Sequence, residues 1–282
     1  MGMVNIKNEL WALQIIALLK TKLVTEGICN PNVVPSAQGD KCHIVGAGEV
    51  TVSDTNQDAD IEYQDPADTD TEFTYNVDKK FALIVHDKDV KQAAIPWQAL
   101  YADRGAYGLV KALDASVFAD HASAGLDSYE TGTTAWQLGA SGADVPALFA
   151  ALAKQLDDAD APDAGRFVVL PSVGVQAVRL YMAGKNTNWG DKVTENGVVG
   201  DFMGFTIHKS NNLTTAAGVI HGLAGIKGDG IAWKTQIDAN DIEALRSEGR
   251  FATLVRGRCL AGHKVYRPGI VVDLNLNSTL LA

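Results

Sequence analysis

The chain has 282 residues, with 24 Lys and Arg against 34 Asp and Glu, and a formal net charge of −10. A composition of 46% hydrophobic and 21% charged residues is typical of a globular protein and excludes a disordered chain. The acidic balance argues against a basic nucleic-acid-binding protein, and no segment reaches the roughly 18 apolar residues of a membrane span. The length fits one large domain or two small ones.

The N-terminal segment has the spacing of an amphipathic helix over residues 5–25. We do not interpret it as a signal peptide, because Gln14 interrupts its apolar stretch and lysines follow where a cleavage site would be. The helix is too apolar to stand alone in water, so we expect it to dock on another surface.

Two strands are expected next, over residues 43–53 and 71–86, with a very acidic stretch between them. Together they predict an extended hairpin with a charged tip. An isolated two-stranded hairpin is marginally stable in water. This hairpin must therefore lie on its own domain or on a neighbouring subunit.

The middle of the chain predicts three helices, over residues 98–123, 144–160 and 173–183. Asp144 and Ser172 are expected to be N-caps of the second and third helix. A buried strand is predicted over Arg166–Leu170, and residues 126–143 are expected to be a loop or weak strands.

Strands dominate the rest of the chain, over residues 198–210, 218–223 and 252–276. Residues 231–245 fit either a short helix or a strand. Because helices and strands are mixed without regular βαβ units, the predicted fold class is α+β.

The three cysteines are far apart and form no CxxC pair: Cys29, Cys42 and Cys259. An odd count without metal-ligand spacing excludes a disulfide framework and argues against a zinc site. We expect three reduced thiols in a cytosolic product.

The search for catalytic motifs is mostly negative: the sequence has no phosphate loop, dinucleotide fingerprint, HExxH or GxSxG motif. Ser172 follows a strand as a nucleophile elbow would, but its neighbours do not match that motif. The six histidines are scattered: His43, His86, His121, His208, His221 and His263. Of these, His208 and His221 fall in strands that could bring them together. We assign no catalytic, cofactor-binding or metal-ligating residue.

The acidic stretch has oxygen-bearing side chains at positions 1, 3, 5, 7, 9 and 12 of a calcium-loop pattern: Asp54, Asn56, Asp58, Asp60, Glu62 and Asp65. Ala59 replaces the turn glycine, the final ligand is Asp instead of Glu, and flanking helices are not expected. We interpret residues 54–65 as a solvated acidic loop tip. Weak cation binding at an intersubunit contact is the alternative.

The C-terminal fifth is relatively basic, through Arg246, Arg250, Arg256, Arg258, Lys264 and Arg267. These side chains form a solvated face or meet the acidic hairpin of a neighbouring subunit.

Four stretches in order carry a family resemblance. Asp78–Asp87, followed by Gln92, resembles the return strand of an extended loop leading into a spine helix. Arg166–Pro171 resembles an axial-domain strand and turn, Gly200–Asn211 a glycine-phenylalanine strand ending in Ser-Asn, and Gly262–Pro268 a closing strand. Together they resemble the major capsid protein of tailed bacteriophages, with the Hong Kong 97-type fold.

The resemblance implies five regions. They are an N-terminal arm (1–42), an extended hairpin loop or E-loop (43–90), a spine helix and peripheral domain (91–143), an axial domain (144–245), and C-terminal strands that complete the peripheral and axial domains (246–282).

The resemblance also implies a structural protein without enzyme activity. It would self-assemble into an icosahedral shell of pentamers and hexamers around phage double-stranded DNA, which an acidic wall contacts only non-specifically. The implied partners are many copies of the chain, a separate scaffolding protein, a portal, and decoration or tail proteins, with no membrane. The implied location is the virion, after synthesis in the host cytoplasm. The alternatives are an encapsulin-type bacterial compartment shell and a soluble calcium-dependent binding module.

Overall fold

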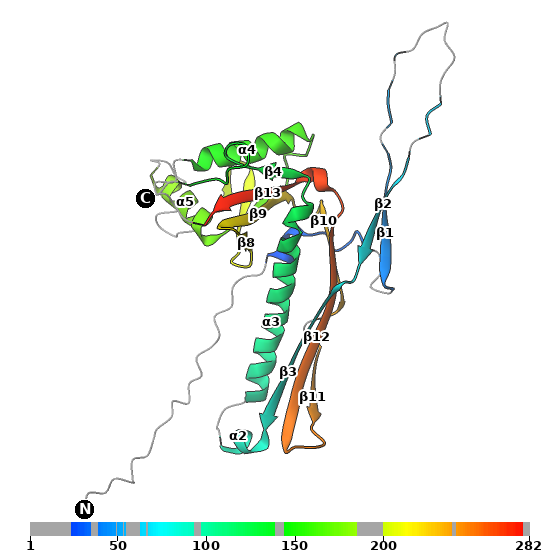
Figure 1. Cartoon of the computed structure of the whole chain (residues 1–282), viewed down its shortest axis with the longest axis vertical. Coiled ribbons are helices and arrows are strands. Elements are labelled where there is room, and N and C mark those ends of the chain that lie inside the picture. Colours follow the sequence, from blue (N-terminus) through cyan, green and yellow to red (C-terminus); the bar gives the residue numbers. More distant parts are fainter. Residues whose placement is uncertain are drawn as a thin grey trace, which may run out of the picture.

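The computed structural model describes residues 24–34, 39–48, 50–52, 54, 63–65, 67–92, 97–138, 144–184, 200–238 and 241–278. Nearly all of the helix expected over residues 5–25, and most of the acidic loop 54–65, lie outside the described residues. Figure 1 shows a layered sheet with helices, a long helix beside an elongated sheet, and a thin two-stranded ribbon that projects from them.

The helices are α1 (Thr25–Ile28), α2 (Asp87–Gln92), α3 (Trp97–Phe118), α4 (Val145–Asp158) and α5 (Ser172–Ala183), with the 3-10 helices η1 (Ala119–Ser123) and η2 (Pro268–Ile270). The strands are β1 (Lys41–Gly46), β2 (Thr69–Thr74), β3 (Val77–His86), β4 (Leu126–Ser128), β5 (Arg166–Leu170), β6 (Asp201–Phe202), β7 (Phe205–Lys209), β8 (Thr214–Ala216), β9 (Val219–Ile226), β10 (Ile231–Ile237), β11 (Ile242–Arg246), β12 (Ala252–Val265) and β13 (Val271–Asn277). The expected α+β class is confirmed.

The seven-stranded sheet has the order β4-β13-β9-β5-β7-β6, and β8 pairs with β9. Its strand β5 is buried along its whole length because its two faces pack on different layers. Val168 and Leu170 join a core with α4 and α5. Phe167 and Val169 join a second core with α1 and the end of α3. This burial on both faces explains why the β5 sequence is continuously apolar.

The four-stranded sheet is organised around β12, which pairs with β3 on one edge and with β10 and β11 on the other. Helix α3 lies along β3 and β12 (Figure 1). The Phe81 ring fills the space between the helix and the sheet, where a Cβ atom at Gly105 or Gly257 would lie 2.3 Å or 2.6 Å from it. The absence of a side chain at both positions therefore sets how closely α3 approaches the sheet.

Helix α3 and η1 together span residues 97–123, which confirms the long helix expected over residues 98–123, with a 3-10 last turn. The helix expected over residues 144–160 and the strand Arg166–Leu170 are also confirmed. Residues 231–245 resolve into the strands β10 and β11. Residues 198–210 form a short hairpin of β6 and β7 within their described part.

The strand expected over residues 71–86 is wrong, because the chain leaves the strand conformation at Tyr75 and Asn76. The strand before this break, β2, pairs with β1, whereas β3 after it pairs with β12. The ribbon ladder therefore has six residue pairs, from Lys41↔Thr74 to Gly46↔Thr69, and is shorter than the expected hairpin.

One of the two expected helix caps is wrong in position, and the other is confirmed in position. Ser172 is the first residue of α5, and Pro171 is its N-cap. Pro171 has the extended φ and ψ of a residue outside the helix, so the helix begins one position earlier than expected. Asp144 is the N-cap residue of α4, as expected, but its side chain makes no capping hydrogen bond.

Candidate functional site

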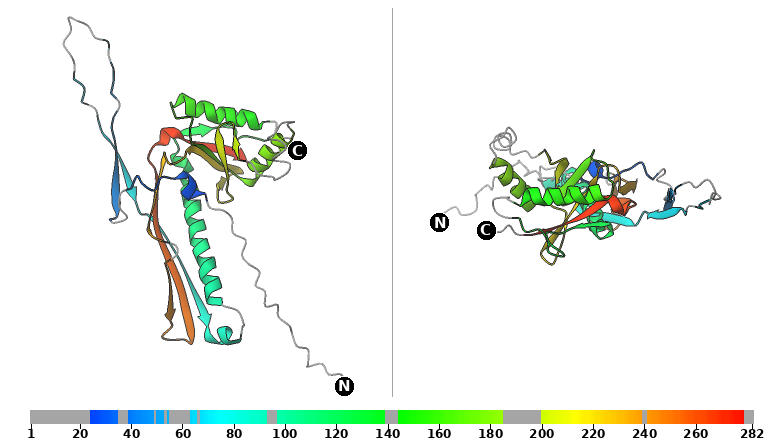
Figure 2. Two further views of the ribbon diagram at one scale, coloured as in Figure 1. Left: turned by 180° about the vertical axis from the view of Figure 1, so that it is seen from behind. Right: turned by 90° about the horizontal axis from the view of Figure 1, so that it is seen from above.

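The β1–β2 ribbon projects away from both sheets (Figure 1, Figure 2). Val45 within its ladder and Val50 beyond it are exposed, and Val52 and Tyr63, also beyond the ladder, are each 93% exposed. Exposure of large apolar side chains to water is unfavourable, and an isolated two-stranded element is only marginally stable. The ribbon therefore has the properties of a surface that another chain covers.

The base of the ribbon is anchored in the body. Phe73 of β2 is fully buried with Val34, Tyr75 and Ala232. A Cβ atom at Gly262 of β12 would lie 2.7 Å from the Phe73 ring. The ribbon thus has a fixed base and an exposed apolar end, which suits a projecting contact element.

The described part of the chain begins beside α1, which is anchored on the long helix. Asp114 of α3 is 1% exposed. Its carboxylate accepts hydrogen bonds from the backbone N–H groups of Val24 and Thr25, at 3.3 Å and 3.1 Å, and from the Thr25 hydroxyl. The amide of Asn212 donates to the other oxygen at 2.8 Å. Asp114 therefore ties the point at which the N-terminal segment joins the body to the long helix.

Exposed apolar side chains also occur at the far end of the four-stranded sheet, near α2. Its exposed side chains are Leu83, Ile84, Val90, Leu245 and Phe251, of which Phe251 is 86% exposed. Arg246 of β11 and Asp87 of α2 form a two-pronged ion pair beside it. The guanidinium lowers the pKa of the Asp87 carboxyl, mainly through this hydrogen bonding.

The arginines of the basic C-terminal cluster mostly pair within the chain, which neither sequence interpretation anticipated. Arg258 pairs with Asp78 of β3, and this hydrogen bond lowers the pKa of the Asp78 carboxyl. The other three pairs are Arg246–Asp87, Arg256–Glu243 and Arg267–Asp229. The acidic partners of these four arginines lie in the same chain and outside the ribbon. The acidic hairpin of a neighbouring subunit is therefore not needed to balance the arginine charges.

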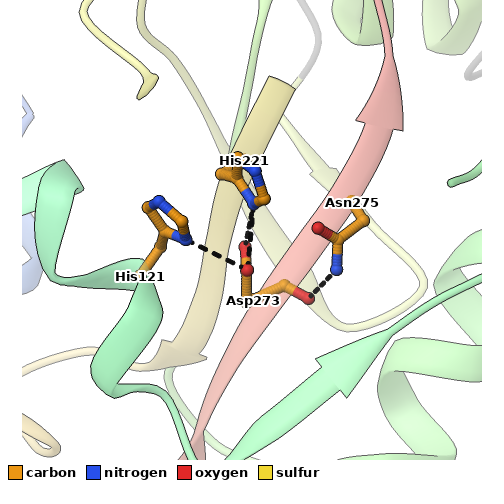
Figure 3. Close-up of polar contacts among 4 residues, drawn as sticks. All are labelled: His121, His221, Asp273 and Asn275. Carbon is orange, nitrogen blue, oxygen red and sulfur yellow. Dashed lines mark hydrogen bonds and ion pairs between the residues drawn. The ribbon is translucent and has the colours of Figure 1, made fainter. Parts of the chain in front are cut away.

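The junction between the two sheets holds five aspartate and histidine side chains. Asp120 of η1 lies 2.5 Å from His263 Nδ1 of β12. His121, the next residue, lies 3.1 Å from Asp273 Oδ2 of β13, and His221 of β9 lies 3.0 Å from the same oxygen. The His121 and His221 rings stack at 3.9 Å (Figure 3).

The structure does not bring His208 and His221 together, although their strands left that possibility open. Strand β5 lies between β7, which carries His208, and β9, which carries His221. His208 instead lies against the Phe167 ring. His221 meets His121 instead, and the sequence gives no signal for this contact, because His121 lies in a separate expected helix far along the chain.

The other candidate residues are dispersed. Cys29 and Cys259 are buried free thiols, and Cys42 is a partly exposed one. In the calcium-loop pattern, Asp54 and Asp65 are exposed, and the ligand positions between them lie outside the described residues. No helix among the described residues is long and apolar enough to cross a membrane.

No protein-family model and no curated protein matches the sequence. Solved structures do match nearly the whole chain. A chain from the structure of Mycobacterium phage Che8 has a TM-score of 0.82 and 24% identity, covering 99% of this chain and 100% of the other. A chain in the capsid of Cyanophage P-SCSP1u has a TM-score of 0.74 and 16% identity, covering 99% and 95%. A chain in the mature capsid of bacteriophage PhiM1 has a TM-score of 0.72 and 11% identity, covering 98% and 94%.

These similarities establish the fold: the chain has the architecture of phage capsid structures over nearly its full length. The family expected from the four sequence stretches is thereby confirmed at the level of fold.

Proposed function

We propose that this chain is a major capsid protein that self-assembles into the icosahedral shell of a tailed phage around double-stranded DNA. The observation that carries the proposal is the full-length structural similarity to phage capsid chains. In such a shell the chain forms pentamers and hexamers and is located in the virion after synthesis in the host cytoplasm.

The exposed surfaces support this proposal independently. The ribbon and the exposed apolar side chains near α2 lie outside the two main cores. Heterologous contacts between copies can bury such elements and extend into closed lattices. Each buried Å² of apolar surface contributes roughly 25 cal/mol. Many copies make a shell hard to dissociate because their modest contacts act together.

A structural role without catalysis is part of this proposal. The partners we propose are further copies of the chain, a separate scaffolding protein, a portal, and decoration or tail proteins. Packaged DNA is contacted non-specifically, since a net charge of −10 repels phosphates and leaves the DNA free to move along the wall. The phage origin of the matched capsids favours a phage shell over an encapsulin-type compartment.

The regions expected from the sequence remain proposals within this function: an arm (1–42), an E-loop (43–90), a spine helix and peripheral domain (91–143), an axial domain (144–245) and completing strands (246–282). The pairing of β3 with β12 is relevant to the E-loop, because it makes residues 77–86 part of the rigid sheet. The part of the E-loop free to reach a neighbour is then the ribbon.

The ribbon provides the test of this function. Val52→Asp replaces an apolar side chain, which is 93% exposed in the isolated chain, with a charged one. We expect folded subunits with normal thermal unfolding but few particles in negative-stain electron microscopy. Val52→Thr, which nearly keeps the shape, is the matched control and should assemble normally. Normal particle yield from Val52→Asp, and from a chain whose residues 50–65 are replaced by a short turn, would contradict the assembly role of the ribbon.

A further inference from the structure

A mostly buried carboxylate shared by two histidines lies where η1 meets the seven-stranded sheet (Figure 3). His121 Nδ1 and His221 Nδ1 lie 3.1 Å and 3.0 Å from Asp273 Oδ2. One ligand atom from each of the three side chains lies within 4.8 Å of the other two. The three residues come from η1, β9 and β13, so packed secondary structure holds them in place.

We propose that His121, His221 and Asp273 form a binding site for a divalent transition-metal ion of the Zn²⁺ type. Two imidazole nitrogens and one carboxylate oxygen are a donor set that Zn²⁺ accepts, whereas Mg²⁺ and Ca²⁺ prefer oxygen alone. A tetrahedral ion with bonds of about 2.0 Å separates its donor atoms by roughly 3.3 Å. The nitrogen–oxygen separations of 3.0 Å and 3.1 Å are close to that spacing.

Asn275 provides an independent indication. It is 1% exposed, and its Oδ1 atom has no hydrogen-bond partner among the described residues. Asn275 lies opposite His221 in the β9–β13 ladder, so the two side chains share one face of the sheet. Figure 3 shows the amide oxygen turned towards His221 and Asp273. A buried carbonyl oxygen without a partner is costly, and an ion in the cluster would remove that cost. We therefore assign Asn275 Oδ1 the fourth donor position.

Metal entry must rearrange the histidine rings. They now stack with 17° between their planes. A ring nitrogen that donates a hydrogen bond to a carboxylate oxygen carries a hydrogen. When an ion occupies Nδ1, that hydrogen moves to Nε2. Since the nitrogen lone pair lies in the ring plane, the rings must turn apart about Cβ–Cγ, a torsion that is broad for histidine. A bound ion would then link η1 directly to β9 and β13.

The site is tested by titrating the full-length, untagged chain with Zn²⁺ alone in a calorimeter, with Mg²⁺ for comparison. We expect one Zn²⁺ per chain and no Mg²⁺ binding. In His121→Gln and His221→Gln, Zn²⁺ affinity should fall at least about tenfold. His43→Gln is the matched control, because His43 forms a single exposed pair with Asp70 at 2.7 Å, and it should bind Zn²⁺ as the natural chain does. Unchanged affinity in both cluster variants would overturn the proposal.

The visible absorption of bound Co²⁺ tests the site in the natural chain, so this measurement does not depend on whether a variant folds. The natural chain with Co²⁺ should show the intense visible absorption of a four-coordinate site, and added Zn²⁺ should abolish it. A Co²⁺ spectrum identical to that of the ion in buffer would contradict the site. Neither experiment requires shell assembly, so the outcome is independent of the proposed function.

Discussion

Asp120 and His121 are consecutive residues of η1, yet their side chains pair with different sheets. Asp120 Oδ2 lies 2.5 Å from His263 on β12 of the four-stranded sheet. His121 Nδ1 lies 3.1 Å from Asp273 on β13 of the seven-stranded sheet. Because η1 continues α3, this pair of residues fixes the end of the long helix between the two sheets.

The Asp120 link predicts a loss of stability on substitution. The Nε2 atom of His263 is already buried without a partner among the described residues. Asp120→Ala removes the partner of Nδ1 as well, so we expect the free energy of unfolding to fall by about 1–3 kcal/mol. Urea denaturation of unassembled subunits measures this. Exposed Asp127→Ala on β4 is the control, and an equal loss in both variants would argue against a special role for Asp120.

The anchor at Asp114 predicts a larger effect. Asp114→Asn replaces a carboxylate that accepts hydrogen bonds from Val24, Thr25 and Asn212 with an amide whose NH₂ group faces some of these donors. We expect a loss of roughly 2–4 kcal/mol in the free energy of unfolding. Proteolysis should also cut the N-terminal segment more readily. Lys111→Gln, at an exposed position of the same helix, should change neither measurement.

Two glycines of α3 predict opposite outcomes for the same substitution. A Cβ atom at Gly105 would lie 2.3 Å from the Phe81 ring, whereas a Cβ atom at Gly108 meets nothing within 4 Å. Gly105→Ala should therefore destabilise the subunit by about 1–3 kcal/mol through overpacking. Gly108→Ala should stabilise it by up to about 1 kcal/mol through helix propensity.

Thermal unfolding of the two alanine variants separates these cases. Phe81→Leu combined with Gly105→Ala should recover part of the loss, because the smaller side chain makes room for the methyl group. Similar melting temperatures for the two single variants would show that Phe81 does not set the approach of α3.

The cysteines predict selective chemical labelling. Burial, with smaller contributions from Asp114 and Asp120, raises the pKa of Cys29 well above its ordinary range. Burial also raises the pKa of Cys259 to about 11, with Asp238 and Asp78 adding to the effect. The thiolate is the reactive form, so near pH 8 a thiol reagent should label Cys42 alone in native subunits. Three labelled thiols are expected in denaturant, and rapid native labelling of Cys42→Ser would contradict this assignment.

The sequence predicts well the elements that are defined by the local spacing of their apolar residues. Leu148, Leu152 and Leu156 of α4 all face one core, so their helical spacing is visible without any partner. The break between β2 and β3 is invisible for a physical reason. Phe73, Val77 and Val85 are all buried, although they belong to strands that pair with different partners. Because the apolar alternation continues across the break and is interrupted only at Lys79, it hides a change of sheet.

The histidine cluster could not be predicted from spacing. His121 and Asp273 are separated by 152 positions, and His221 and Asp273 by 52. They meet because β9 pairs with β13 and because η1 crosses the face of that sheet. Strand order and helix placement of this kind are properties of the tertiary fold, and no motif of fixed length records them.

The central claim is that one copy of this chain exposes apolar surfaces that become buried when it assembles with other copies. The direct measurement is light scattering of the purified chain, alone and co-expressed with a scaffolding protein, followed by electron microscopy of the largest species. We predict hollow particles of many copies in which each ribbon lies on an adjacent subunit. A chain that remains a monomer in both preparations, with the ribbon folded against its own sheets, would contradict the claim.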